Sequence, residues 1–211
     1  MKDSLVRAGP VAERFLTPIS ENETRRFVVL DRDGTLIEER EYVSDPDEVR
    51  LIPGAGQALR ELSQMGFGLV VITNQSGVGR GFFDDVQLRS VHGRLNELLE
   101  AEGVRLDGLY VCPHKPDDGC DCRKPKLGLL KKAAQELDFR LENCVVIGDK
   151  ISDIEMGRAI GATTFLVRTG YGAEIAAEGK SGADHVVDDL ARAVAVIRKI
   201  TGKQPAENRD R

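Results

Sequence analysis

Short apolar runs rich in β-branched residues recur along the chain, and amphipathic stretches separate them. The runs span 27–30, 69–72, 109–111, 144–147 and 164–167. In the stretches between them apolar residues recur three and four positions apart, as in helices with one buried face, at 57–65, 86–102, 127–137 and 151–160. Strands that are apolar on both faces and alternate with helices indicate a parallel sheet covered on both sides. We therefore predict an α/β fold, a Rossmann-like three-layer sandwich with a central parallel sheet, a candidate short strand at 185–187 and a closing helix at 193–200.

The length of 211 residues suits one domain with tails. The polar, mixed sequence at 1–26 predicts an N-terminal arm, 27–201 the folded domain, and 202–211 a C-terminal tail. Hydrophobic residues make up 41% of the chain, which is enough for a sizeable core. We expect the protein to work as a monomer.

The absence of targeting segments and the net charge argue against two classes of partner, membranes and nucleic acids. No apolar run approaches the ~20 residues that a membrane-spanning helix needs, and the N-terminus lacks the apolar segment of a secretory signal. We expect a cytoplasmic protein without a membrane partner, and in that reducing compartment clustered cysteines indicate metal binding or catalysis before disulfides. The net charge of −5 argues against a nucleic-acid partner, but local cations can still bind an anionic substrate.

Chemically active side chains follow four of the apolar runs, in the third case at the end of the Cys/His stretch that comes after the run. In parallel α/β sheets, ligands bind beyond the carboxyl ends of the strands, so these side chains are expected to meet at one edge. Carboxylates, a hydroxyl and cations that meet there indicate an active site. They are Asp31, Thr73 and Asn74, Arg123 and Lys124, and Asp149.

Asp31 and Asp33 stand two positions apart where the first run ends. Side chains at this spacing in extended chain point to one side, and Gly34 permits a sharp turn after them. Two carboxylates in one small site repel each other, which raises one pKa. We expect Asp31 to attack phosphorus and a protonated Asp33 to donate to the leaving alkoxide and later accept a proton from water. The alternative for this short pattern by itself is a turn with a helix cap.

A carboxylate that attacks a phosphate dianion needs the charge repulsion offset, and Mg²⁺ with carboxylate ligands does this. Asp149 supplies a second carboxylate from another strand end, although it could instead cap the following helix. Asp153, one helical turn later, could join the metal site or its surroundings, but it is expected to be a first-turn acid that favours the helix dipole. Lys124 can screen the phosphoryl charge, and the Thr73 hydroxyl can donate to a phosphoryl oxygen.

Three cysteines and a histidine lie close together in the stretch CPHKPDDGCDC. Cys112, His114, Cys120 and Cys122 have the spacing C-x-H-x5-C-x-C, which suits a closed, structural, tetrahedral Zn²⁺ site. The alternative is a set of free thiols on a surface loop, and a redox dithiol is disfavoured because no CxxC is present. Cys144 opens an apolar run and is expected in the core.

Other polar residues carry weaker expectations. Closing the loop on Zn²⁺ would fix the position of Arg123 and Lys124, which follow it. Gln75 and Ser76 follow the second run and could contact substrate, with helix capping as the alternative for Ser76. His92 is expected to be structural.

Four stretches carry a resemblance to a known family: DRDGT (31–35), TNQSG (73–77), RKPK (123–126) and GDKISD (148–153). In this order they resemble the four motifs of haloacid-dehalogenase-type phosphatases, over about residues 27–172. The resemblance implies that Asp31 is the nucleophile and Asp33 the acid/base. It further implies that Asp31, the Asp33 carbonyl and Asp149 bind Mg²⁺, and that Thr73 and Lys124 bind the phosphoryl group.

The stretches CPH (112–114) and CDCRKP (120–125) resemble the branch that contains heptose-bisphosphate and histidinol-phosphate phosphatases, which have short loops in place of a cap domain. TNQSGVGRGFF (73–83) and FLVRTGYG (165–172) resemble the heptose enzymes. The resemblance implies removal of the 7-phosphate of D-glycero-D-manno-heptose 1,7-bisphosphate, on the route to nucleotide-activated heptose for cell-surface glycans. The second phosphate needs a second cation, for which Arg80 and Arg123 are candidates, and specificity is left to the loops at about 38–46, 76–83 and 112–123.

Three alternatives remain at this point. A histidinol-phosphate phosphatase would use the same mechanism. A phospho-accepting signalling domain also uses Asp, Mg²⁺, Thr and Lys on a parallel sheet, but Asp33 would speed its dephosphorylation. A zinc-binding interaction module would leave the carboxylates at two separate strand ends unexplained.

Overall fold

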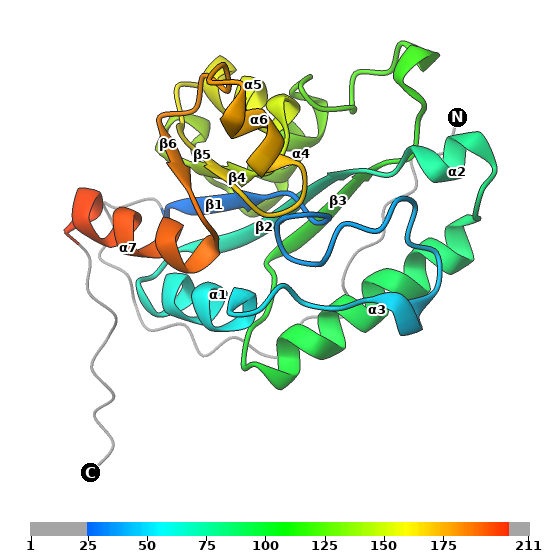
Figure 1. Cartoon of the computed structure of the whole chain (residues 1–211), viewed down its shortest axis with the longest axis horizontal. Coiled ribbons are helices and arrows are strands. Elements are labelled where there is room, and N and C mark those ends of the chain that lie inside the picture. The colour runs from blue at the N-terminus through cyan, green and yellow to red at the C-terminus, as the bar shows by residue number, and fades with distance from the viewer. Residues whose placement is uncertain (1–24, 203–211) are drawn as a thin grey trace.

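The computed structural model describes residues 25–202, which form a sandwich of a parallel sheet between two layers of helices (Figure 1). The six strands pair in the order β3-β2-β1-β4-β5-β6, and every neighbouring pair is parallel. This confirms the predicted fold class and the candidate sixth strand. The strands are β1 (Phe27–Leu30), β2 (Gly68–Asn74), β3 (Gly108–Cys112), β4 (Val145–Gly148), β5 (Thr163–Val167) and β6 (His185–Val187).

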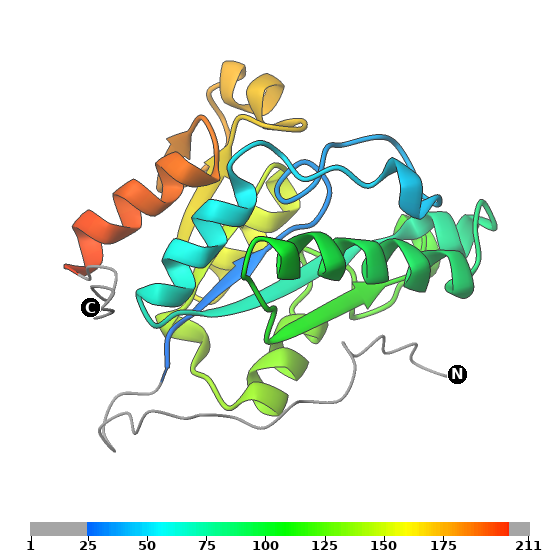
Figure 2. The same cartoon turned by 90° about the horizontal axis from the view of Figure 1, so that it is seen from below.

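Helices cover both faces of the sheet. One layer contains α1, α3 and α7, and α4 and α5 pack on the opposite face (Figures 1 and 2). The α-helices are α1 (Ala55–Gln64), α2 (Ser76–Arg80), α3 (Asp85–Ala101), α4 (Gly128–Leu137), α5 (Ile151–Ala159), α6 (Gly172–Ala177) and α7 (Leu190–Thr201). Short 3-10 turns lie at Pro46–Glu48, Pro116–Asp118 and Leu141–Asn143. The long helices lie where the apolar periodicity predicts them, whereas α2 and α6 are too short to show a period.

The central strands β1, β2, β3 and β4 are mostly apolar because each contributes side chains to two separate cores. In β1, Val28 and Leu30 pack into the core under α1, α3 and α7, while Phe27 and Val29 face the core under α4 and α5. All four side chains are buried. Since burying such a side chain stabilises the fold by about 1.5–3 kcal/mol, both faces of the strand hold it in the centre of the sheet.

The N-terminal end of the described chain is attached to this body by two arginines. Arg25 forms an ion pair with Asp107 at 2.6 Å, and Arg26 donates to the Asn143 carbonyl at 3.3 Å. Most of the predicted arm at 1–26 and nearly all of the predicted tail at 202–211 lie outside the described residues.

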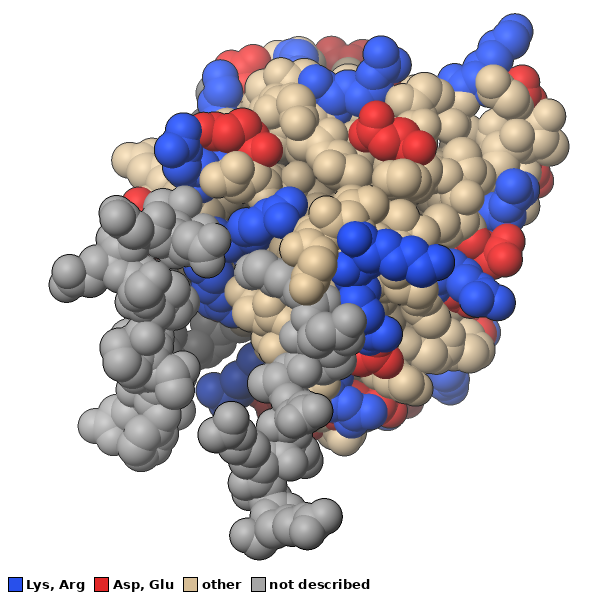
Figure 3. All heavy atoms as spheres, turned by 90° about the vertical axis from the view of Figure 1, so that its left-hand side faces the viewer, with Lys and Arg blue, Asp and Glu red and all other residues tan. Residues whose placement is uncertain are grey.

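The surface of the described body is mixed in charge. On the face drawn in Figure 3, lysines and arginines form separate groups with acidic and uncharged side chains between them. No helix within residues 25–202 is long and apolar enough to cross a membrane.

The strand order reverses between β1 and β4, which are neighbours at the centre of the sheet. Open α/β sheets bind ligands at such a switch point, beyond the strand ends. Loops 31–54 and 113–127 extend from this edge, and within them the longest regular element is a single 3-10 turn. The part of the chain that the structure describes therefore has no inserted cap domain, as predicted.

Candidate functional site

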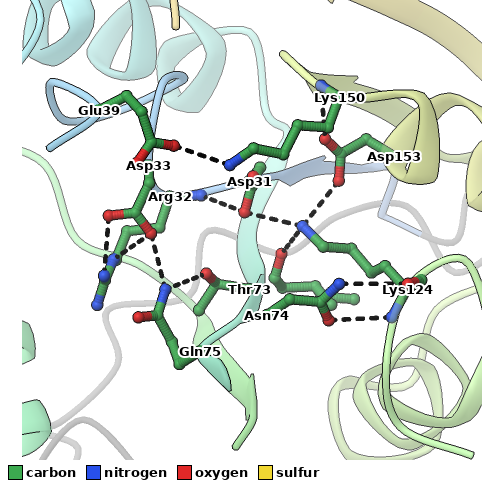
Figure 4. Close-up of polar contacts among 11 residues, drawn as sticks. Asp31, Arg32, Asp33, Glu39, Thr73, Asn74, Gln75, Lys124, Lys150 and Asp153 are labelled. Carbon is green, nitrogen blue, oxygen red and sulfur yellow. Dashed lines mark hydrogen bonds and ion pairs between the residues drawn. The ribbon is translucent and has the colours of Figure 1, made fainter. Parts of the chain in front are cut away.

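Lys124 reaches the centre of the site and pairs with two carboxylates (Figure 4). Its Nζ atom lies 2.8 Å from Asp31 Oδ1 and 2.7 Å from Asp153 Oδ1, and it donates to the Ile72 carbonyl at 2.5 Å. Burial by itself would lower the pKa of Lys124, but the carboxylates of Asp153 and Asp31 outweigh it and the net shift is upward. A permanently charged ammonium therefore lies beside Asp31.

Asn74, a predicted substrate contact, holds the backbone of Lys124. Its Oδ1 accepts from the Lys124 N–H at 3.0 Å, and its Nδ2 donates to the Lys124 carbonyl at 3.2 Å. Asn74 is the last residue of β2, so the sheet fixes the amide. The reciprocal pair aligns the loop that carries Lys124 with the strand end.

Asp149 follows β4 and lies in a narrow space between two glycines. A Cβ atom on Gly34 or on Gly170 would lie 2.2 Å from Asp149 Oδ2, and both glycines have positive φ. Oδ2 accepts from the Tyr171 N–H at 3.0 Å, whereas the buried Oδ1 has no hydrogen-bond partner within the described residues. Burial, with the nearby Asp31 carboxylate, raises the pKa of Asp149 to about 8. Lys150 is the N-cap residue of α5, so Asp149 does not take its alternative role as that cap.

The orphaned oxygen of Asp149 is one sign that a cation fits here. Ligand atoms of Asp31, Asp149 and Asp153 lie within 4.8 Å of one another, and all three residues are buried. Carboxylate oxygens are the ligands that Mg²⁺ prefers. The donor set and the unpaired acceptor therefore suit Mg²⁺, with the Asp153 carboxylate beside the two predicted carboxylates Asp31 and Asp149.

Asp153 does more than the helix-dipole role expected for it. It lies in the first turn of α5 and accepts from the Lys150 N–H at 3.1 Å, as a capping acid does. It is also 1% exposed and pairs with Lys124. Burial raises the pKa of Asp153 to about 6, against the opposing effect of Lys124.

The carboxyl of Asp33 lies apart from this group and contacts Arg32. The Arg32 guanidinium donates to Asp33 Oδ2 at 3.0 Å and to Oδ1 at 2.8 Å. Burial raises the pKa of Asp33, but the charge and hydrogen bonds of Arg32 exceed that effect, and the net shift is downward. The expectation of a protonated Asp33 is therefore wrong for this arrangement, because the positive partner is nearer than a competing carboxylate.

Gln75 connects Asp33 to Thr73. Its Nε2 donates to Asp33 Oδ2 at 2.7 Å and to Thr73 Oγ1 at 2.8 Å. Both Gln75 and Thr73 are buried. Since the Thr73 hydroxyl accepts from Gln75, its own proton is available to an oxygen on a ligand.

A pocket of about 430 Å³ opens above these residues, within the size range of small-ligand sites. Arg80 is exposed at the end of α2 and is not part of this lining, whereas Arg123 is. Ser76 lines the pocket as the first residue of α2 and does not occupy its cap position. The lining residues are Asp33, Glu39, Glu41, Tyr42, Asn74, Gln75, Ser76, Arg123, Lys150, Ser152 and Tyr171.

From its place beside Asp149, Lys150 is expected to tune the metal carboxylate or to pair with another acid, but its individual partners in this pocket are not predicted by the sequence. Glu39 accepts from Lys150 Nζ at 2.8 Å, and Nζ also lies 5.1 Å from the centroid of the Tyr171 ring. Lys150 stands next to Asp149 in the sequence, which is a usable signal. Glu39 lies in the predicted specificity loop at 38–46, but it is 111 positions from Lys150, and the sequence does not show that the two residues pair. Arg32 was overlooked although it stands between two candidate aspartates.

The predicted zinc ligands meet in one cluster. Their ligand atoms lie within 4.8 Å of one another. Cys122 Sγ lies 3.2 Å from Cys112 Sγ and 3.1 Å from His114 Nδ1, and Cys112 Sγ lies 3.7 Å from Cys120 Sγ. These separations fit four ligands at about 2.0–2.3 Å from one Zn²⁺ ion. The cysteines are not joined by disulfides, and Cys144 is buried in the core as expected.

The loop at 112–122, which carries the four predicted zinc ligands and is called the zinc loop below, is attached to the phosphate-binding side of the site by backbone hydrogen bonds. The Gln75 N–H donates to the Cys112 carbonyl at 2.7 Å, and the Gly79 N–H donates to the Pro113 carbonyl at 2.9 Å. Arg123 donates to the His114 carbonyl at 3.2 Å. The loop therefore supports α2 and Arg123 together.

Comparison with known proteins agrees with this geometry. Residues 121–193 match a family model described as HAD-hydrolase-like. The chain is 37% identical over 175 residues to D-glycero-beta-D-manno-heptose-1,7-bisphosphate 7-phosphatase of Pseudomonas aeruginosa, covering 82% of this chain and 98% of that protein. It is 42% identical to the Yersinia pestis enzyme of the same name, covering 78% and 90%.

A solved structure is similar as well. The D,D-heptose 1,7-bisphosphate phosphatase of B. bronchiseptica, complexed with magnesium and phosphate, superposes with a TM-score of 0.77 at 35% identity. The match covers 83% of this chain and 99% of that one. That relative binds in its crystal the two ligands that the carboxylates and Lys124 are suited to hold.

Proposed function

This chain belongs to the HAD-like hydrolases, together with the heptose-bisphosphate 7-phosphatases that it resembles, and we propose that it removes the 7-phosphate of D-glycero-β-D-manno-heptose 1,7-bisphosphate. The relatives' names supply the substrate and its anomer. The single observation that carries the chemistry is the meeting of Asp31, Lys124 and Asp149 at the switch point of the sheet. The product would serve the synthesis of nucleotide-activated heptose for lipopolysaccharide and related glycans.

Asp31 is the proposed nucleophile. One of its carboxylate oxygens attacks phosphorus, the bond from phosphorus to the sugar oxygen breaks, and an aspartyl-phosphate forms. Lys124 and the Thr73 hydroxyl stabilise the charge on the transferring phosphoryl group. Asp31, Asp149 and the Asp33 carbonyl would hold Mg²⁺, which offsets the repulsion between carboxylate and phosphate when it is bound.

Asp33 is the proposed acid/base. It lines the pocket, so its carboxyl can exchange a proton with the leaving oxygen. In the second step water attacks phosphorus and gives its proton to Asp33, the bond to Asp31 breaks, and inorganic phosphate leaves. Because the contact with Arg32 favours the ionised form of Asp33 between turnovers, Asp33 takes up a proton again when the next substrate binds. A phospho-accepting signalling domain, by contrast, would require this second step to be slow.

Arg123 is the candidate for the second phosphate. It lines the pocket and offers a planar fork that suits phosphate oxygens. Arg80, the other candidate, is exposed and outside the lining. The carboxylates of Glu39 and Glu41 are suited to accept hydrogen bonds from sugar hydroxyls.

The proposal extends to the structural metal of the protein and to the compartment in which it works. The cluster of Cys112, His114, Cys120 and Cys122 would hold a structural Zn²⁺ ion, and a cluster of free thiols is typical of a reducing compartment, which supports a cytoplasmic enzyme.

The test is a comparison of substrates. Phosphate release is measured with Mg²⁺ from both anomers of heptose 1,7-bisphosphate and from histidinol phosphate, with Asp31→Asn as the blank. We expect the highest kcat/KM for the β-anomer and no turnover in the variant. A preference for histidinol phosphate would reject the substrate, and equal rates in the variant and the parent would reject the mechanism.

A further inference from the structure

Arg32 is a fully buried cation with two sets of contacts. One edge of its guanidinium makes the two hydrogen bonds to Asp33 described above, and such a two-point contact fixes the direction of a carboxylate as well as its distance. The remaining nitrogen lies 2.8 Å from His92 Nε2. Within residues 25–202, Asp33 and His92 are the polar partners that the structure gives this guanidinium.

His92 contacts Arg32 from the core-facing side of α3. It is 1% exposed and stands 60 positions from Arg32 in the sequence. Because a guanidinium can only donate, Nε2 of His92 is the acceptor and the ring proton is on Nδ1. Burial, followed by the charge of Arg32, lowers the pKa of His92 well below its usual range, which agrees with a neutral ring.

A purely structural role explains this pair poorly. A buried charge costs several kcal/mol even when it is paired, and apolar side chains of similar volume commonly replace such groups without loss of stability. The guanidinium lies between a rigid helix and a carboxylate on the pocket wall. Arg32 is therefore placed so that its contact with α3 can hold the Asp33 carboxylate in a fixed position.

We propose that His92 and Arg32 are a positioning pair for Asp33: the imidazole fixes the guanidinium, and the guanidinium holds the Asp33 carboxylate where it accepts the proton of the attacking water. This inference rests on the proposed function and adds to it two residues that do not touch the substrate. Without the His92 acceptor, one edge of the Arg32 guanidinium has no partner, and the Asp33 carboxylate that it holds can move.

The test uses p-nitrophenyl phosphate with Mg²⁺ in a rapid-quench instrument. Nitrophenolate leaves without needing a proton, so phosphorylation of Asp31 does not depend on Asp33, whereas hydrolysis of the aspartyl-phosphate does. For His92→Leu we expect an unchanged burst of nitrophenolate and a steady-state rate lower by about tenfold or more. Phosphorylated protein should accumulate because its hydrolysis becomes rate-limiting. The values of kcat and KM should then fall by the same factor, and kcat/KM should stay unchanged.

Two further variants keep the test decisive. His92→Gln places an amide oxygen near the position of Nε2 and should restore the steady-state rate. Arg32→Lys keeps the charge but cannot bridge Asp33 and His92, so it should reproduce the selective loss even where His92→Leu folds poorly. Leu95→Ala, at another buried position of the same helix, controls for lost stability and should change burst and steady state equally.

The outcomes separate the inference from the proposed function. Selective loss of the steady state in His92→Leu and Arg32→Lys, with rescue by glutamine, supports the positioning pair. An equal fall in burst and steady state, or no change, overturns it while the parent remains a phosphatase. Activity of Asp31→Asn equal to that of the parent would instead reject the proposed function.

Discussion

Lys124 Nζ lies 2.8 Å from Asp31 Oδ1, with 4% of the lysine and 5% of the aspartate exposed. Lys124 lies in the loop before α4, and Asp31 follows the end of β1. The side-chain amide of Asn74 holds the Lys124 backbone in place with two hydrogen bonds. A cation held this close both neutralises the nucleophile before substrate arrives and screens the phosphoryl charge afterwards.

The first prediction concerns this lysine. Lys124→Met should lower kcat/KM by about 10²-fold or more, because a preorganised charge at the reacting group is lost. The variant should also lose about 3–5 kcal/mol of stability, since Asp31 and Asp153 are left without their buried partner. Lys131→Met, which removes an exposed lysine of α4, is the control. Retention of most activity in Lys124→Met would contradict the role assigned to it.

The second prediction concerns pH and Mg²⁺. Asp149 has a pKa of about 8 in the folded, metal-free protein and about 3.9 when unfolded, so between these values only the folded state holds the proton. The free energy of unfolding contributed by this group therefore falls as pH rises through that window. Since Mg²⁺ needs the carboxylate, binding at pH 7 should release protons. Calorimetry in two buffers of different ionisation enthalpy measures this release.

The variant Asp149→Asn tests the same carboxylate by replacing it with an amide that cannot ionise. Without Mg²⁺, the variant should unfold at a higher temperature than the parent at pH 8, by about 2–4 °C for each kcal/mol gained. Added Mg²⁺ should no longer raise its Tm. Asp188→Asn, at a side chain that is 75% exposed, should leave both properties unchanged. A parent protein that binds Mg²⁺ without releasing protons would refute the raised pKa.

The third prediction concerns the cysteine cluster. Cys122→Ala should lose its zinc, as measured by elemental analysis, and should also lose activity, because Arg123 and Lys124 follow Cys122 directly. Cys144→Ala removes a buried thiol outside the cluster and should keep stoichiometric zinc. Zinc retained in Cys122→Ala, or lost in Cys144→Ala, would show that the cluster is not the site.

The fourth prediction separates two arginines. Arg123→Ala should raise KM for heptose 1,7-bisphosphate by about tenfold or more, the value of a charge-assisted hydrogen bond, and should have little effect with heptose 7-phosphate. Arg80→Ala, outside the pocket lining, should leave both KM values unchanged. The reverse pattern would move the second phosphate to the α2 loop.

Local and periodic features of this fold could be predicted from the sequence. The central strands could be predicted because burial on two faces makes them mostly apolar, and the zinc ligands because all four lie on one short loop. Asp31, Lys124 and Asp149 followed from a topological rule about strand ends.

Contacts that depend on side-chain direction could not be predicted. The spacing of Asp31 and Asp33 suggested that their side chains face one small site and repel each other, yet the turn after β1 directs the Asp33 carboxyl to Arg32. The contact of Arg32 with His92 joins residues 60 positions apart. The periodicity of α3 marks His92 as buried but does not say what its ring meets.

Identification of the phosphate that leaves tests the central claim most directly. Pure β-anomer of D-glycero-D-manno-heptose 1,7-bisphosphate is incubated with the protein and Mg²⁺, and the products are followed by phosphorus NMR. We predict that the 7-phosphate resonance is replaced by inorganic phosphate while the 1-phosphate resonance remains, and that Asp31→Asn changes neither. Loss of the 1-phosphate first, or no loss of either, would contradict the account.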